Sequence, residues 1–202
     1  MHNLLPPPLA ARLSPAQIAA LQEYARLLTE INTQVNLISR KDIAAVWSHH
    51  ILPSLLLLCW YELPAGAKVL DIGTGGGLPG IPLAIAQSHA SFLLIDSTRK
   101  KIEAVRRMTQ SLGLEQRVQA EWIRAEELQG QFPVIVGRAV APLSRVLGWA
   151  KPLLAKGGVV YYYTGEPLPE VPKGWRATFL AFREVCSGEA YLSSKGILCL
   201  RR

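Results

Sequence analysis

The chain has few cysteines and few charged residues for its length. Its three cysteines, at positions 59, 186 and 199 of 202 residues, form no Cys-x-x-Cys pair. This odd number and wide spacing argue against a disulfide framework and a zinc knuckle. The longest apolar run, residues 55–61, is far shorter than the roughly 20 residues that cross a membrane. The first residues lack the basic start and apolar core of a secretory signal, so we expect a cytoplasmic protein without membrane contact.

Charge is sparse but biased. Only 18% of the residues are charged and 50% are hydrophobic. This excludes a disordered chain and favours a compact domain with strands buried on both faces. Lysine and arginine outnumber the acidic residues by 22 to 15, giving a net charge of +7. Such a charge is compatible with nucleic acid as a partner without requiring it.

The pattern changes near residue 65. Before it, Ser14-Pro15-Ala16-Gln17 resembles a capping box that opens a helix, and Asp42 is a candidate cap for a second helix. After it, β-rich runs alternate with helical segments, which predicts an α/β domain with a parallel sheet. We expect a helical cap (1–64) packed on the body (65–202) as one compact unit. Strands are expected at 69–72, 92–96, 118–123, 134–136, 159–163, 177–185 and 196–200, and helices at 81–87, 99–112 and 143–154. The first five strands should be parallel and the sixth and seventh antiparallel.

A glycine-rich loop follows the first strand. Gly75, Gly77 and Gly80 satisfy the G-x-G-x-x-G pattern of dinucleotide sites, and Asp96 follows at the distance of a ribose-binding acid. The loop also reads as D-x-G-x-G-x-G from Asp71, which resembles the first motif of S-adenosylmethionine-dependent methyltransferases. A pyrophosphate favours positive potential, whereas a sulfonium cation tolerates an acid nearby. Asp71 therefore favours the second interpretation.

Two further acids end strands at the same edge. Asp96 can hold two ribose hydroxyls, or it can cap the helix that begins near Thr98. Glu126 can contact an adenine ring, or it can stand in the acidic first turn of a helix. Replacing Asp96 with alanine should weaken cofactor binding with little loss of stability.

Several segments together resemble one family. They are Asn36-Leu37-Ile38-Ser39, His50 with Ser54-Leu55, Leu78-Pro79-Gly80-Ile81-Pro82, Asp96-Ser97 with Lys100, Ala125-Glu126-Glu127 and Arg138-Ala139. By these residues the chain resembles the RsmG (GidB) family of bacterial 16S rRNA guanine-N7 methyltransferases over nearly its whole length. The resemblance implies a Rossmann-like class I methyltransferase fold with a seven-stranded, mostly parallel sheet and a helical N-terminal extension.

The resemblance also implies an activity and a site. The activity would be methyl transfer from S-adenosylmethionine to N7 of one guanine in the decoding region of 16S rRNA. The partner would be 16S rRNA or the small ribosomal subunit, bound by a monomer without a metal. Contacts to the methyl donor would come from Gly73, Gly75, Leu78, Asp96, Ala125, Glu126 and Arg138. The chain departs from the family at Pro53, where an acid is usual, and at Thr164-Gly165, where Lys-Gly is usual.

No residue is expected to act as a general base. N7 of a neutral guanine carries a lone pair, so it can attack the methyl group without first losing a proton. Catalysis can then come from holding the two groups in line. Arg138 could pair the carboxylate of the donor, hold a phosphate or be a surface charge. Three other functions stay open: methyl transfer to a small molecule, an NAD(P)-dependent oxidoreductase, and a non-catalytic RNA-binding module.

Basic residues cluster on the helix expected at 99–112. They are Arg99, Lys100, Lys101, Arg106 and Arg107, and Lys100 shares a helix face with Arg107. The cluster is either a footprint for RNA phosphates or a solvated face. His49-His50 is not expected to bind a metal, and His50 should pack between the N-terminal helices and the sheet. Tyr161-Tyr162-Tyr163 should alternate across its strand, with one or two rings in the core.

Overall fold

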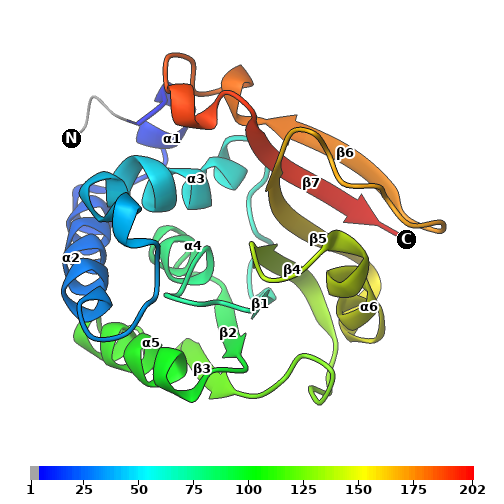
Figure 1. Ribbon diagram of the computed structural model, residues 1–202, viewed down its shortest axis with the longest axis horizontal. Coiled ribbons are helices and arrows are strands. Elements are labelled where there is room, and N and C mark those ends of the chain that lie inside the picture. Colours follow the sequence, from blue (N-terminus) through cyan, green and yellow to red (C-terminus); the bar gives the residue numbers. More distant parts are fainter. Residues whose placement is uncertain (1–4) are drawn as a thin grey trace.

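The computed structural model describes residues 5–202 and contains one seven-stranded sheet with helices on both faces (Figure 1). The strand order is β3-β2-β1-β4-β5-β7-β6. The strands are β1 (Lys68–Ile72), β2 (Ser91–Asp96), β3 (Val118–Trp122), β4 (Phe132–Arg138), β5 (Leu154–Gly165), β6 (Arg176–Ala181) and β7 (Lys195–Arg201). All seven expected strands are present, each near its predicted position.

The first five strands are parallel, as predicted, but the last two differ from the expectation. β7 pairs antiparallel with both β5 and β6, so β6 runs in the same direction as β5. β6 also ends at Ala181 rather than at residue 185. Ala181 pairs with Gly196 near the start of β7, and residues 182–184 turn into a short 3₁₀ helix. The predicted strand was too long because its last residues have no partner strand.

Helices cover the two faces unequally. The helices α1 (Pro7–Ala10), α2 (Pro15–Asn32), α3 (Leu52–Leu55), α4 (Gly80–Ala86) and α5 (Arg99–Ser111) contribute to one apolar core, and α6 (Leu143–Leu153) packs in the second. In Figure 1, α2 and α5 stand on one side of the sheet and α6 on the other. Tyr161 and Tyr163 lie in the first core and Tyr162 in the second, so the predicted alternation is confirmed, with all three rings buried.

The N-terminal segment packs directly onto the sheet. The capping box is present, because Ser14 Oγ accepts from the Gln17 amide and Gln17 Oε1 accepts from the Ser14 amide. Leu28, Leu52 and Val69 belong to one continuous core. Residues on both sides of the boundary between 64 and 65 therefore pack in the same core. The division into a cap (1–64) and a body (65–202) stays a prediction. No helix in residues 5–202 is long and apolar enough to cross a membrane.

Asp42 does not cap a helix, contrary to the expectation. Ser39 caps a 3₁₀ helix at Arg40–Ala45, which continues into a π-helical turn at Trp47–Ile51. The prediction failed because Asp42 lies within the 3₁₀ helix, where its carboxylate meets His49 and His50.

Candidate active site

The glycine-rich loop joins β1 to α4 in left-handed backbone conformations. Gly73, Gly75 and Gly77 have φ values of 68°, 57° and 97°, which side chains with a Cβ rarely adopt. A Cβ on Gly73 would overlap the side chain of Val140, which follows β4. The loop therefore approaches the end of β4 so closely that only glycine fits at position 73.

Helix α2 supports this loop from the side. The Tyr24 hydroxyl donates to the Gly76 carbonyl over 2.9 Å and is fully buried. A Cβ on Gly76 would lie 2.8 Å from Leu28 Cδ1 of the same helix. The N-terminal extension is thus part of the wall behind the loop.

Asp71 holds the loop from beneath. Its Oδ2 accepts from Thr74 Oγ1 over 2.7 Å and from the Gly80 amide over 3.0 Å. Its Oδ1 is buried without a partner in the described part of the chain. Burial raises the pKa of Asp71 to about 7, although the two hydrogen bonds oppose this shift. Asp71 lines none of the three hollows described below, so its carboxyl group shapes the loop from beneath.

Asp96 does not cap α5, because Thr98 is the N-cap and no side chain caps this helix; its contact to ribose stays a prediction. Its Oδ2 accepts from the Gly75 amide over 3.0 Å, and its Oδ1 accepts from the Thr98 amide, just before α5, over 2.8 Å. Each carboxylate oxygen can accept a second hydrogen bond, so ribose hydroxyls can still be held. The expectation that Asp96 can be replaced with little loss of stability is revised, because replacement leaves two amides unpaired.

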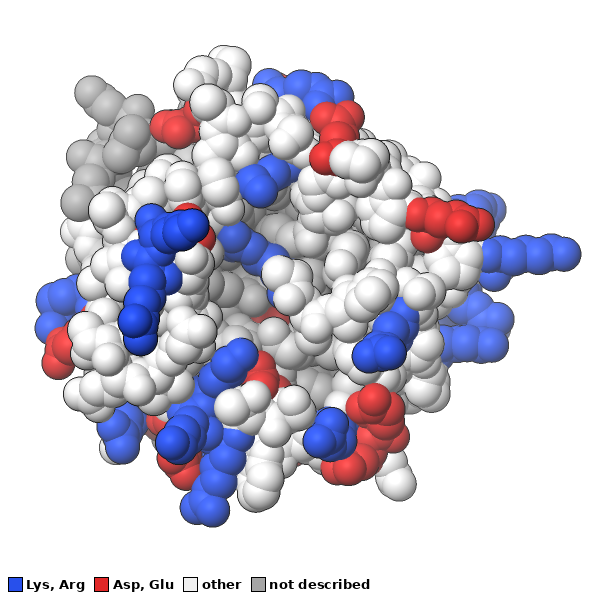
Figure 2. All heavy atoms as spheres, viewed as in Figure 1, with Lys and Arg blue, Asp and Glu red and all other residues white. Residues whose placement is uncertain are grey.

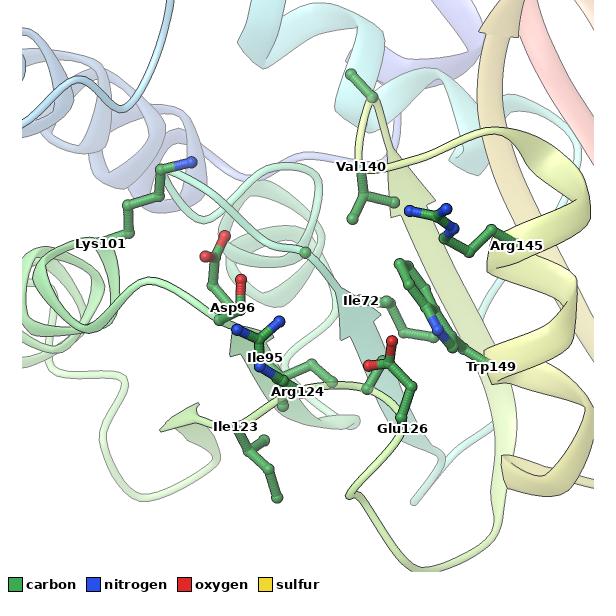
Figure 3. Close-up of a pocket in the computed structure, with 14 residues that line it drawn as sticks. Ile72, Ile95, Asp96, Lys101, Ile123, Arg124, Glu126, Val140, Arg145 and Trp149 are labelled. Carbon is green, nitrogen blue, oxygen red and sulfur yellow. The ribbon is translucent and has the colours of Figure 1, made fainter.

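A first hollow of about 310 Å³ lies at the carboxyl ends of the parallel strands (Figure 3). It brings together four of the predicted residues: Gly73, Asp96, Ala125 and Glu126. Figure 3 shows the Asp96, Arg124 and Glu126 side chains around it, with Arg145 and Trp149 of α6 opposite. The sequence analysis missed Arg145 and Trp149. Their spacing of four residues on the helix after the fourth strand was the available signal.

A second hollow, of about 370 Å³, adjoins the first. It contains the remaining predicted residues, Gly75, Leu78 and Arg138. Gly73, Lys101 and Ala139 line both hollows. Ala139 has φ +51°, a strained conformation for a residue with a Cβ, at the point where the two hollows meet. All seven predicted contact residues therefore line two adjoining hollows, although their contacts to a donor stay predictions.

Arg138 is held by backbone rather than by an acid. Its guanidinium donates to the carbonyls of His49 over 2.6 Å and His50 over 3.3 Å, and lies 3.2 Å from His50 Nδ1. Because an arginine only donates, His50 Nδ1 accepts and the ring proton sits on Nε2, which faces Asp42 at 3.5 Å. Burial and the charge of Arg138 lower the pKa of His50 to about 4. His50 is thus a packed neutral residue, as predicted.

A third hollow of about 310 Å³ contains both departures from the family pattern. Pro53, Thr164 and Gly165 line it together with Arg138 and Tyr191. Lys195 is the second positively charged residue of this hollow, after Arg138. It pairs with Gly165 between β5 and β7, and its Nζ lies 4.3 Å from the centre of the Tyr191 ring. The other side of Tyr191 has the His49 ring stacked on it at 3.6 Å. Lys195 had no sequence signal, because it reaches the site through strand pairing, and Tyr191 is carried there by the 3₁₀ turn at Ala190–Leu192 before β7.

The family model and the sequence relatives that match this chain agree on one family. The family model described as rRNA small subunit methyltransferase G matches residues 17–177. The protein of that name from Chlorobium luteolum is 50% identical over 157 residues, which cover 77% of this chain but only 66% of the relative. The one from Christiangramia forsetii is 39% identical over 170 residues, covering 81% and 80%. A solved structure of a putative S-adenosyl-L-methionine-dependent methyltransferase from Methanococcus maripaludis superposes with a TM-score of 0.51 at 19% identity, covering 68% of this chain and 61% of the other. At that identity it shows a shared fold.

Proposed function

The chain belongs to the rRNA small subunit methyltransferase G family, and from this premise we propose that it transfers a methyl group from S-adenosylmethionine to N7 of a guanine in 16S rRNA. The observation that carries the proposal is the pair of adjoining hollows at the carboxyl ends of the strands. Open α/β sheets bind ligands at this edge.

The first hollow fits the adenosine part of the methyl donor. Asp96 keeps free acceptor sites for two ribose hydroxyls, and Ala125 and Glu126 border the place for the adenine. Gly73, Lys101 and Ala139 line both hollows, so the rest of the donor can extend from the first hollow into the second. When bound, the donor supplies an electrophilic methyl group on a sulfonium.

The residues of this chain act by placement. Guanine N7 needs no base, and the proposal assigns none. Arg138 holds the π-helical turn against the end of β4 and lines the second hollow, where its guanidinium can meet the amino-acid end of the donor or RNA. The contribution to rate comes from aligning N7 with the methyl group.

The surface around the hollows favours a polyanion. Figure 2 shows lysine and arginine side chains distributed around the central hollow on this face. Lys100 and Arg107 are exposed on α5, whereas Arg106 donates through Nε to the Ala120 carbonyl. We propose that part of the basic cluster contacts RNA phosphates. We also propose that the protein acts as a monomer in the cytoplasm.

The decisive test is methyl transfer from labelled S-adenosylmethionine to 16S rRNA and to small subunits from cells that lack this gene, followed by mapping of the label. We expect one labelled guanine, modified at N7. Transfer to no RNA despite measurable donor binding would contradict the rRNA substrate. It would then point to a small-molecule acceptor.

Replacing Asp96 with alanine should weaken donor binding about tenfold or more, because the ribose hydroxyls lose their acceptor. It should also lower the free energy of unfolding by about 1–3 kcal/mol, since the amides of Gly75 and Thr98 lose theirs. Calorimetry with the donor and urea unfolding measure the two effects. Unchanged donor affinity in the folded variant would remove Asp96 from the binding site.

Reversing two charges tests the RNA face. The double variant Lys100→Glu, Arg107→Glu should bind rRNA at least about tenfold more weakly. Each lost phosphate contact should also reduce the salt dependence of binding, by about 0.7 in slope for single strands. The matched control is Arg201→Glu, Arg202→Glu, which changes the net charge equally at exposed positions. If both double variants lose RNA affinity equally, the loss comes from the change in net charge and not from contacts of Lys100 and Arg107.

A further inference from the structure

One aromatic side chain is exposed beside the proposed donor site. Trp122 ends β3, the edge strand of the sheet, and is 57% exposed. Within residues 5–202, one other large hydrophobic side chain is exposed: Leu168, at 42%. Nothing in the fold requires an indole in water at this position, and the methyl-transfer site does not use it.

The indole is exposed but fixed. Its Nε1 donates to the Ser97 carbonyl over 3.0 Å, which fixes the orientation of the ring. The guanidinium of Arg99 lies 5.7 Å from the ring centre. Arg99 is itself held by Glu103, whose Oε1 lies 2.8 Å from Arg99 Nε. The ring is therefore pre-oriented, which reduces the entropy lost when a ligand stacks on it.

Its position links it to the first hollow. Trp122 pairs in register with Asp96, and the Ser97 that binds its Nε1 lines the hollow. Arg124, two residues further, lines the same hollow and is exposed. Lys100 and Arg99 add positive charge on α5, against Glu103 and Glu121 nearby in sequence.

We propose that Trp122, supported by Arg99, stacks on an unpaired base of the RNA substrate outside the pocket where the methyl group is transferred. Fixed aromatic rings beside arginine are the usual platforms for single-stranded bases, since every base has a stacking face. A protein partner would need a wider apolar surface than one indole among charged residues. The inference rests on the proposed function and adds a second RNA contact to it.

The experiment compares Trp122→Ala, Trp122→Phe and the control Leu168→Ala. RNA affinity is measured with an unpaired segment of 16S rRNA and with small subunits, and donor affinity by calorimetry. Trp122→Ala should bind RNA roughly tenfold more weakly, as expected for one stacked base, with donor affinity unchanged. Trp122→Phe keeps a ring and should stay within about threefold of wild type, because stacking on a ring is what holds the base. Leu168→Ala should bind RNA like wild type.

Three results would overturn the inference. One is wild-type RNA affinity in Trp122→Ala. Another is an equal loss in Trp122→Phe and Trp122→Ala, because the hydrogen bond to Ser97 would then be the important feature. The third is a parallel loss of donor affinity, which would mean that the change acts through Asp96. If the wild-type protein methylates rRNA and Trp122→Ala binds it normally, only this inference fails. If the wild-type protein neither binds nor methylates rRNA, the proposed function fails and takes this inference with it.

Discussion

Replacing Gly73 with alanine should reduce the affinity for the methyl donor by about 100-fold or more. The new methyl group would occupy the space of the Val140 side chain, and both residues line the first hollow. The backbone at φ 68° adds about 1–2 kcal/mol of strain for a residue with a Cβ. Either the loop or the segment after β4 must move, and residues of both line the proposed donor site. Calorimetric titration with S-adenosylmethionine measures the loss.

Two controls separate collision from strain. Gly113 has φ +65° but no atom within 4 Å of a built Cβ, so Gly113→Ala imposes a similar strain without a collision. We expect it to keep full donor affinity. Adding Val140→Gly to Gly73→Ala should restore part of the affinity, because it removes both Cγ2 and Cβ of Val140, the two atoms closest to the new methyl group. Full donor affinity in the single Gly73 variant would show that the approach of the loop to β4 does not define the site.

The stability of the protein should fall with rising pH because of Asp71. Its pKa is about 7 in the folded state against 3.8 for an ordinary aspartate. Between these values the unfolded chain gives up the proton and the folded protein keeps it, so unfolding becomes more favourable as the pH rises. A difference of about three pKa units, at about 1.4 kcal/mol each, sets an upper limit of about 4 kcal/mol. The contribution is complete below pH 4 and lost above pH 7.

The variant Asp71→Asn has no such titration. The difference in free energy of unfolding between wild type and Asp71→Asn should therefore shift by up to about 4 kcal/mol in favour of the variant from pH 4 to pH 7.5. Urea unfolding at a series of pH values measures it, and taking the difference removes the contribution of His50 and other groups. Glu115→Gln, which removes an exposed carboxylate, is the control and should run parallel to wild type. Parallel curves for Asp71→Asn would contradict the role assigned to its burial.

The positions of site residues were predicted best where a polar residue or a glycine directly follows a buried strand. The glycines after β1, the acid at the end of β2 and the arginine at the end of β4 each follow a buried strand, and parallel strands carry such residues to one edge. Their sequence positions therefore suffice to predict that Gly73, Asp96 and Arg138 gather at that edge. The order of the elements was predicted for the same reason.

The remaining features depend on packing that no local pattern encodes. Asp71 stands out in the sequence as a polar residue on an apolar strand, but that pattern does not tell that its carboxyl group is fully buried beneath the loop. Asp42 looked like a cap, but the chain around it forms 3₁₀ and π-helical turns that carry it to two histidines. Lys195 enters the site through the β5–β7 pairing, which joins residues that are distant in the sequence, and Tyr191 comes with it on the short 3₁₀ turn before β7.

The contact between Tyr24 and Gly76 couples ligand binding to the docking of the N-terminal helix. A ligand that binds only when the glycine-rich loop is ordered also stabilises the contacts that keep the loop ordered. The hydrogen bond from Tyr24 of α2 is one of these contacts. With the donor at 100 times its dissociation constant, this linkage amounts to about 2.7 kcal/mol. The amide protons of α2, whose residues line none of the three hollows, should then exchange with solvent more slowly when the donor is present. The helix would thereby report the occupancy of a site that it does not touch.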